Sequence, residues 1–196
     1  MRTLFIALIL ISFKAFPQKQ LKFGKVIADK SFCKDASLLD SNNICNSENQ
    51  LELWFAIRSI SMNDMNLDYS LIKLQYNDSG WKAVRYVYKL TELASNPYKA
   101  IYEIDKEIPL KAPTAFETIF SELKKNNIFT LPDQQELIPD SVMNGGNFYN
   151  LTFKARNKFR TYTFFNPEDY KEKFETLTEL KYYTKIAFLF NSLLKE

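Results

Sequence analysis

Three acidic side chains, Asp133, Glu136 and Asp140, fall within one short polar stretch and are the residues best suited to chemistry. Two carboxylates can hydrolyse a glycosidic bond, one as proton donor and the other as base or nucleophile, when their separation is suitable. Any polar loop of this length carries acids, however, and the sequence does not give their separation. We therefore treat them as candidate binding residues, with a carboxylate-dependent hydrolase of envelope glycans or peptides as the alternative.

Histidine is absent from the whole sequence. Because histidine is the commonest general acid or base and the commonest metal ligand, its absence excludes Ser-His-Asp and Cys-His catalysis and every zinc site with a histidine ligand. The S-x-x-K spacing of serine acyl-enzymes does occur, but the S-D-N and K-T-G elements that should accompany it are missing. The sequence therefore identifies no catalytic residue, and we expect a protein that is not an enzyme.

The stretch from Asp64 through Asn66 to Asp68 has the alternating oxygen ligands of a calcium-binding loop. The remaining elements of that loop do not follow. Tyr69 occupies the position of the required glycine, and Gln75 occupies the position of the bidentate glutamate. We therefore expect a surface loop here and no metal site.

Gly145 and Gly146 precede a strand pattern and not a helix, so they do not form the phosphate-binding entry to a helix. They are expected to form a turn that needs positive φ, which glycine adopts easily. No other pattern suggests a cofactor, and none is expected.

Aromatic residues are unusually frequent, with 17 Phe, 11 Tyr and 2 Trp. Tyr86 and Tyr88 alternate along one expected strand that begins near Trp81, and Tyr149 and Tyr162 belong to a later hairpin. Aromatic side chains on a sheet can bind sugars, peptides or a protein partner. Packing in the core is the alternative, and it accounts for most of the Phe residues. These five aromatic residues join the three acids as candidate binding residues.

Residues 1–18 have the pattern of an export signal. Arg2 precedes the apolar run TLFIALILISF, which Lys14 ends, and this run is shorter than the roughly 20 residues that a transmembrane helix needs. The alternative is a buried element at the start of the fold. With the leader removed, we expect one domain over 19–196, with no membrane span, exported to the periplasm or the medium.

Cys33 and Cys45 are the only two cysteines. An even number of cysteines in an exported chain predicts one disulfide between them. Such a bond restricts the unfolded chain and stabilises the fold by about 3 kcal/mol in the chain-entropy model. A reactive thiol is the alternative, but no partner that would stabilise a thiolate is visible.

The formal net charge is +3, and Arg2 and Lys14 both lie in the leader, so the remaining chain carries +3 − 2 = +1. A nearly balanced surface lacks the basic footprint of a nucleic-acid-binding protein. We therefore expect no nucleic acid among the partners.

Hydrophobic periodicity predicts an antiparallel sheet built from hairpins. Alternating apolar residues indicate strands, and turn-forming residues separate the members of each hairpin. The expected strands are 21–28, 51–60, 69–76, 81–90, 98–108, 148–154 and 158–165, with turns at 77–80 and 156–157.

Two main helices are expected to pack on one face of this sheet. Thr114 and Glu117 have the spacing of a capping box, and the helix that follows should end near 126–127. The second helix should begin with Asn166 as its cap and a proline at its first position. An apolar stripe starting at Phe174 should continue this helix, with a break near Lys181. The fold class is therefore α+β.

The carboxy-terminal third carries a series of short motifs. They are Leu131-Pro132-Asp133-Gln134, a glycine turn, Tyr149-x-Leu151-x-Phe153, Arg160-x-Tyr162 and Asn166-Pro167-x-x-Tyr170. This series resembles small exported proteins of unknown function from Bacteroidota-type bacteria. The frequent Phe, Ile, Lys and Asn and the Pro17-Gln18 that ends the leader agree with that resemblance. The resemblance implies export but no activity, because the group has none that can be named.

These observations predict an exported, non-catalytic α+β domain that binds a protein or a glycan. Its binding surface is expected on the sheet or in the loop over 132–147.

Overall fold

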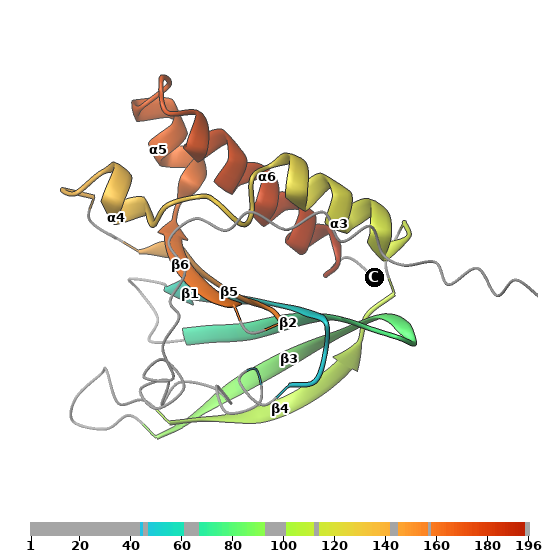
Figure 1. Ribbon diagram of the computed structural model, residues 1–196. Coiled ribbons are helices and arrows are strands. Elements are labelled where there is room, and N and C mark those ends of the chain that lie inside the picture. Colours follow the sequence, from blue (N-terminus) through green and yellow to red (C-terminus); the bar gives the residue numbers. More distant parts are fainter. Residues whose placement is uncertain are drawn as a thin grey trace, which may run out of the picture.

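Strand β1 (Leu51–Ile60) lies inside a six-stranded antiparallel sheet and pairs with β2 on one side and β5 on the other (Figure 1). The structure is a computed structural model that describes residues 44, 47–60, 67–92, 101–111, 114–141, 145–156 and 158–194. The strand order is β4-β3-β2-β1-β5-β6. The other strands are β2 (Leu67–Asn77), β3 (Gly80–Glu92), β4 (Ile101–Pro109), β5 (Gly146–Ala155) and β6 (Lys158–Phe165).

The predicted hairpins are confirmed. Strands β2 and β3 pair from Tyr69 opposite Tyr88 to Asn77 opposite Gly80, and β5 pairs with β6. The Asn77 side chain accepts a hydrogen bond from the backbone N–H of Ser79 at 2.9 Å, and Gly80 has a φ of 97°. The turn residues therefore form the connection as the sequence indicated. The strand expected at 21–28 lies outside the described residues.

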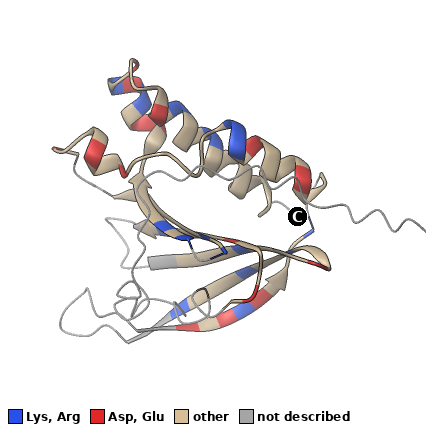
Figure 2. Cartoon of the chain, in the orientation of Figure 1, with Lys and Arg blue, Asp and Glu red and all other residues tan. Residues whose placement is uncertain are grey.

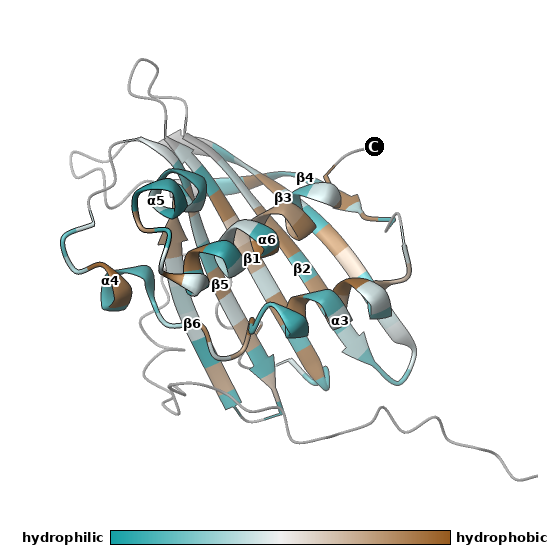
Figure 3. Cartoon of the chain, turned by 90° about the horizontal axis from the view of Figure 1, so that it is seen from above, coloured by the Kyte–Doolittle hydropathy of each residue, from teal (hydrophilic) through white to brown (hydrophobic). Residues whose placement is uncertain are grey.

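The described chain has four helices in place of the two main helices that were predicted, and the sheet with its helices confirms the α+β class. The helices are α3 (Phe116–Lys125), α4 (Gln134–Leu137), α5 (Pro167–Lys173) and α6 (Thr178–Ser192). Figures 1 and 3 show α3, α5 and α6 over one face of the sheet. None of the described helices is both long enough and apolar enough to cross a membrane.

Three details of the helix predictions are wrong. Ala115 is the N-cap of α3 and no side chain caps this end, so Thr114 and Glu117 do not form a capping box. The break predicted near Lys181 comes earlier, between the end of α5 at Lys173 and the start of α6 at Thr178. Asn166 precedes α5 as predicted, but its side chain does not cap the helix.

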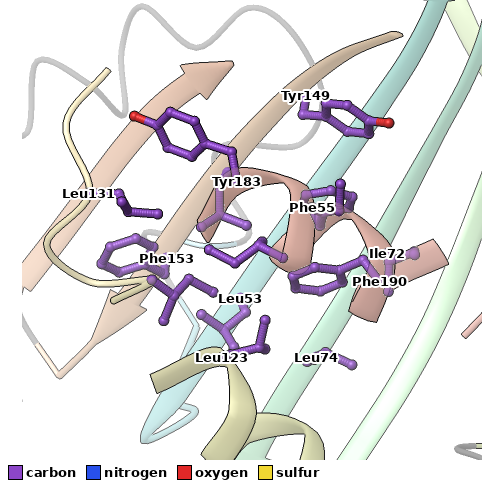
Figure 4. Close-up of a cluster of buried hydrophobic side chains, with 14 of the residues drawn as sticks. Leu53, Phe55, Ile72, Leu74, Leu123, Leu131, Tyr149, Phe153, Tyr183 and Phe190 are labelled. Carbon is purple, nitrogen blue, oxygen red and sulfur yellow. The ribbon is translucent and has the colours of Figure 1, made fainter. Parts of the chain in front are cut away.

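The core fills the space between the sheet and the helix layer (Figure 4). The alternate residues Leu53 and Phe55 of β1 face the helices, and both are fully buried. The ring of Phe55 stacks on Phe190 of α6 with 4.1 Å between centroids, and on Tyr149 of β5 with 5.4 Å. Burial of these large side chains joins α6 to the centre of the sheet.

Candidate functional site

A groove of about 610 Å³ lies between the loop that follows α4 and the helix α5. Figures 1 and 3 show α4 and α5 at the same end of the helix layer. The volume is in the range of small-ligand sites and fits a few side chains or sugar rings. Its lining residues are Leu137, Ile138, Pro139, Asp140, Ser141, Asn166, Asp169, Tyr170, Lys173, Phe174 and Leu177.

The first wall of the groove is held by Asp133 and Gln134, which bind the edge of β6. The Asp133 carboxylate accepts hydrogen bonds from the backbone N–H of Thr163 at 2.9 Å and from its hydroxyl at 2.7 Å. The Gln134 side chain accepts a hydrogen bond from the backbone N–H of Phe165 at 2.9 Å. Because β6 is the edge strand of the sheet, these N–H groups have no neighbouring strand among the described residues. The two side chains therefore fix the α4 segment to the sheet.

Asp133 also caps α4, because its other carboxylate oxygen accepts a hydrogen bond from the backbone N–H of Gln135 at 3.0 Å. Both oxygens are thus used by the fold, and Asp133 does not line the groove. Glu136 is exposed and does not line it either, whereas Asp140 does. Of the three predicted acids, only Asp140 lines the groove.

Buried polar groups also hold the backbone just before α4. The Tyr183 hydroxyl donates a hydrogen bond to the carbonyl of Pro132 at 2.5 Å, and the Arg160 guanidinium donates one to the carbonyl of Leu131. Burial raises the pKa of Tyr183, and the negative charge of Asp133 raises it further. Tyr183 therefore stays protonated and remains a donor at any physiological pH.

The second wall starts at Asn166, which joins the glycine turn to α5. Its side chain donates a hydrogen bond to the carbonyl of Gly145 at 2.8 Å and accepts one from the backbone N–H of Asn147 at 2.8 Å. The predicted positive φ is confirmed, with 82° at Gly145 and 88° at Gly146. A Cβ atom on Gly146 would lie 2.2 Å from Oδ1 of Asn166, so the close approach requires glycine.

Three aromatic rings form a continuous row along α5. Phe165 meets Tyr170 edge to face with 5.4 Å between centroids, and Tyr170 lies parallel to Phe174 with 6.2 Å between centroids. Phe174 is 39% exposed, although the sequence placed it in the apolar stripe of the core. The row thus extends from the core outward, and its last ring faces the groove region in contact with solvent.

The charges in the groove are Asp140, Asp169 and Lys173. Lys173 Nζ lies 5.8 Å from the centre of the Tyr170 ring. Within the described part of the chain, neither acid forms an ion pair. Two carboxylates without a cationic partner therefore lie beside an aromatic wall.

The same described segments contain no group of three or more His, Cys, Asp or Glu residues placed to hold a metal ion. Ser141 also lines the groove and is buried, and its hydroxyl has no hydrogen-bond partner among the described residues. The groove thus offers oxygen acceptors, one ammonium group and aromatic rings, which suit binding.

Three of the predicted aromatic residues are part of the core. Trp81 lies between Tyr76 and Phe120 with 5.1 Å between ring centroids on each side. Tyr149 and Tyr162 are 3% and 2% exposed and face the helices. Packing, the alternative role weighed from the sequence, describes all three.

Tyr86 and Tyr88 lie on the opposite face of the sheet, away from the helices. Lys73 Nζ lies 4.1 Å from the centre of the Trp54 ring and 4.8 Å from that of Tyr86. Tyr88 packs edge to face on Tyr69 with 5.0 Å between centroids. Trp54, Lys73 and Tyr88 are all less than 9% exposed, so this cluster is a second packed layer.

Several predictions fall on residues that the structure does not describe. They are the export signal over 1–18, the disulfide between Cys33 and Cys45, and the calcium-like loop at Asp64 and Asn66.

The residues that sequence reasoning missed are Asp169, Tyr170 and Lys173. The available signal was a pair of aromatic residues, Tyr170 and Phe174, at helical spacing within an otherwise charged segment. Such a pair on a polar helix indicates rings that are not all needed in the core.

Known proteins give no further guide to the groove. No protein-family model, no curated protein and no solved structure matches this chain.

Proposed function

We propose that this protein is an exported, non-catalytic domain that binds a protein or glycan partner. The partner would bind in the groove between segment 137–141, at the end of α4, and helix α5. The observation that carries the proposal is one groove that holds an exposed ring, Phe174, and two carboxylates, Asp140 and Asp169, which form no ion pair with any described residue. Exposed aromatic side chains beside polar groups are typical of binding sites.

A hydrolase is less well supported than a binding domain. Hydrolysis by paired carboxylates needs one acid that can donate a proton to the leaving group. Asp133 uses both oxygens in hydrogen bonds with β6 and α4, and Glu136 does not line the groove. Of the three acids that motivated the hydrolase, only Asp140 lines the groove.

Export is proposed from the pattern of residues 1–18, and it has its own test. Mass spectrometry of the protein from its native cell should show loss of the leader, with the new terminus near residues 15–20. Peptide mapping without reducing agent should then link Cys33 to Cys45. An intact Met1 on the native protein would contradict export, and free thiols would contradict the disulfide.

Partner binding is tested by comparative capture from the native periplasm or culture medium. The bait proteins are the wild type, Phe174→Ala in the groove, and Phe188→Ala as the matched control. Phe188 is also an exposed phenylalanine, 66% accessible on α6, and does not line the groove. We expect a partner that Phe174→Ala loses and Phe188→Ala retains. Equal capture by all three proteins would contradict a binding site in the groove.

A further inference from the structure

The groove lining carries more negative than positive charge, and this restricts the charge of the ligand. Resting on the proposed function above, we propose that the groove binds a short extended peptide segment in which a Lys or Arg residue lies next to an apolar one. The peptide's cationic group would pair with Asp140 and Asp169, and its apolar neighbour would pack on Phe174 and Leu177.

Desolvation of the two carboxylates limits the charge of the ligand. Asp140 and Asp169 are exposed in the free protein, and neither has an ion-pair partner among the described residues. A ligand that covers the groove takes water away from both. Covering a carboxylate without supplying a cation or strong donors is unfavourable, because the lost hydration is not replaced. A ligand with a positive charge therefore fits better than a neutral sugar.

Lys173 is the one cation among the described residues that line the groove. It lies over the Tyr170 ring, and within the described chain it forms no ion pair with Asp169, its neighbour one helical turn away. The lining therefore keeps a net charge of −1 from two acids and one lysine. Charge complementarity of this kind selects partners and sets their orientation.

The groove also has an apolar lining, which can pack against an apolar part of the ligand. Phe174, Leu177, Leu137 and Pro139 line the same groove as the acids. A volume of about 610 Å³ holds a few side chains but not a folded domain. An extended peptide offers a cationic and an apolar side chain within a few residues, which matches both parts of the lining.

The test is a selection with the complete mature protein against a random hexapeptide library on beads. We expect the bound peptides to be enriched in Lys or Arg next to Leu, Ile, Val or Phe. The best peptide is then synthesised, and its affinity is measured by calorimetry with its cationic residue present and replaced by glutamine. Amide chemical shifts identify the site, and they should change over 137–141 and 169–177.

Three variants are expected to weaken, strengthen and leave unchanged the affinity for the peptide. Asp140→Asn with Asp169→Asn should weaken binding about tenfold, since it removes two partly exposed ion pairs with the peptide. Lys173→Gln should strengthen binding about threefold, because it removes a like charge from the site. Asp105→Asn is the matched control on β4, at the opposite edge of the sheet, where Figure 2 shows further acidic residues. It should leave the affinity unchanged.

The outcomes separate this inference from the proposed function. Enrichment of peptides without a cationic residue, or weaker binding by Lys173→Gln, would overturn the inference. If peptides fail while soluble oligosaccharides from the cell envelope shift the amides of 169–177, the groove is a glycan site and the proposed function stands. If neither probe shifts those amides, both the inference and the groove as a binding site are wrong.

Discussion

Asp133 and Thr163 are joined twice: one carboxylate oxygen of Asp133 accepts hydrogen bonds from both the backbone N–H and the hydroxyl of Thr163. The other oxygen caps α4. The Asp133 side chain thus accepts a hydrogen bond from the edge of β6 and caps α4. In this way it fixes the segment that forms one wall of the groove.

Asp133→Ala is expected to lower the free energy of unfolding by about 2–3 kcal/mol, because it removes a helix cap and two charge-assisted hydrogen bonds. Urea denaturation measures the change. Asp133→Asn should fall between this variant and the wild type, since one amide oxygen cannot replace both acceptors. The control is Gln135→Ala in the same turn, where the side chain is exposed and the change should stay within about 0.5 kcal/mol. Equal stability of Asp133→Ala and Gln135→Ala would contradict the structural role of Asp133.

Two buried tyrosines should respond in opposite directions to removal of the hydroxyl. Tyr162 is 2% exposed, and its hydroxyl has no hydrogen-bond partner among the described residues, so Tyr162→Phe should raise the free energy of unfolding by about 1 kcal/mol. Tyr183→Phe should lower it by about 1 kcal/mol, because the carbonyl of Pro132 loses its donor. Thermal and urea unfolding of the two variants in parallel measure the difference. A loss of stability in Tyr162→Phe would show that its hydroxyl does have a partner.

The same tyrosines predict how stability depends on alkaline pH. Burial raises the pKa of Tyr162 well above its ordinary value of 10.0, and burial also raises the pKa of Tyr183 and Tyr149. The folded protein therefore keeps these protons at a pH where the unfolded chain releases them. Below pH 10 these tyrosines do not lower the free energy of unfolding. Above pH 10 the free energy of unfolding falls as the pH rises, by up to about 1.4 kcal/mol per pH unit for each tyrosine.

Urea denaturation between pH 8 and 11.5 tests this dependence. The wild type should lose stability steadily above pH 10, and Tyr162→Phe should lose it less steeply because one of the three groups is gone. Parallel curves for the two proteins would contradict the assignment to Tyr162.

Gly146 and Gly80 form a matched pair, since both have positive φ but only Gly146 is crowded. At Gly80 a Cβ atom would have nothing within 4 Å, so Gly80→Ala should cost only about 1 kcal/mol for its φ of 97°. At Gly146 a Cβ atom would meet the Asn166 side chain, so Gly146→Ala should lower the free energy of unfolding by at least about 1 kcal/mol more. The double variant with Asn166→Ala should lose less than the sum of the two single losses. Additive losses would show that Asn166 does not cause the strain.

The strands were predictable from the sequence because their signals are local. Alternating Leu51, Leu53 and Phe55 identify β1, and Asn77 and Gly80 identify the turn between β2 and β3 by side-chain chemistry alone. The break between α5 and α6 was misplaced because Phe174 and Leu177 keep helical spacing across it. Periodicity does not distinguish one bent helix from two.

The groove was not predictable, because its walls come from segments that meet only in the folded chain. Segment 137–141 follows Asp133 and Gln134, whose side chains bind β6, and α5 comes directly after β6. The approach of the two walls therefore depends on contacts with the sheet and not on local sequence. The role of Asp133 was hidden for the same reason, since its partner Thr163 is 30 positions away. A carboxylate in a loop has the same appearance in sequence whether it binds a ligand or an edge strand.

The pairing of β1 with β5 has a consequence for the order of folding. Strands β1 to β4 follow one another along both the chain and the sheet, whereas β5 joins β1 with Ile60 opposite Gly146. Closing so long a loop is entropically slower than forming the neighbouring hairpins. We expect pulse-labelled hydrogen exchange to protect β2 and β3 before β5 and β6. The groove is built on β6, so a newly made chain should acquire its ability to bind only in the last step of folding.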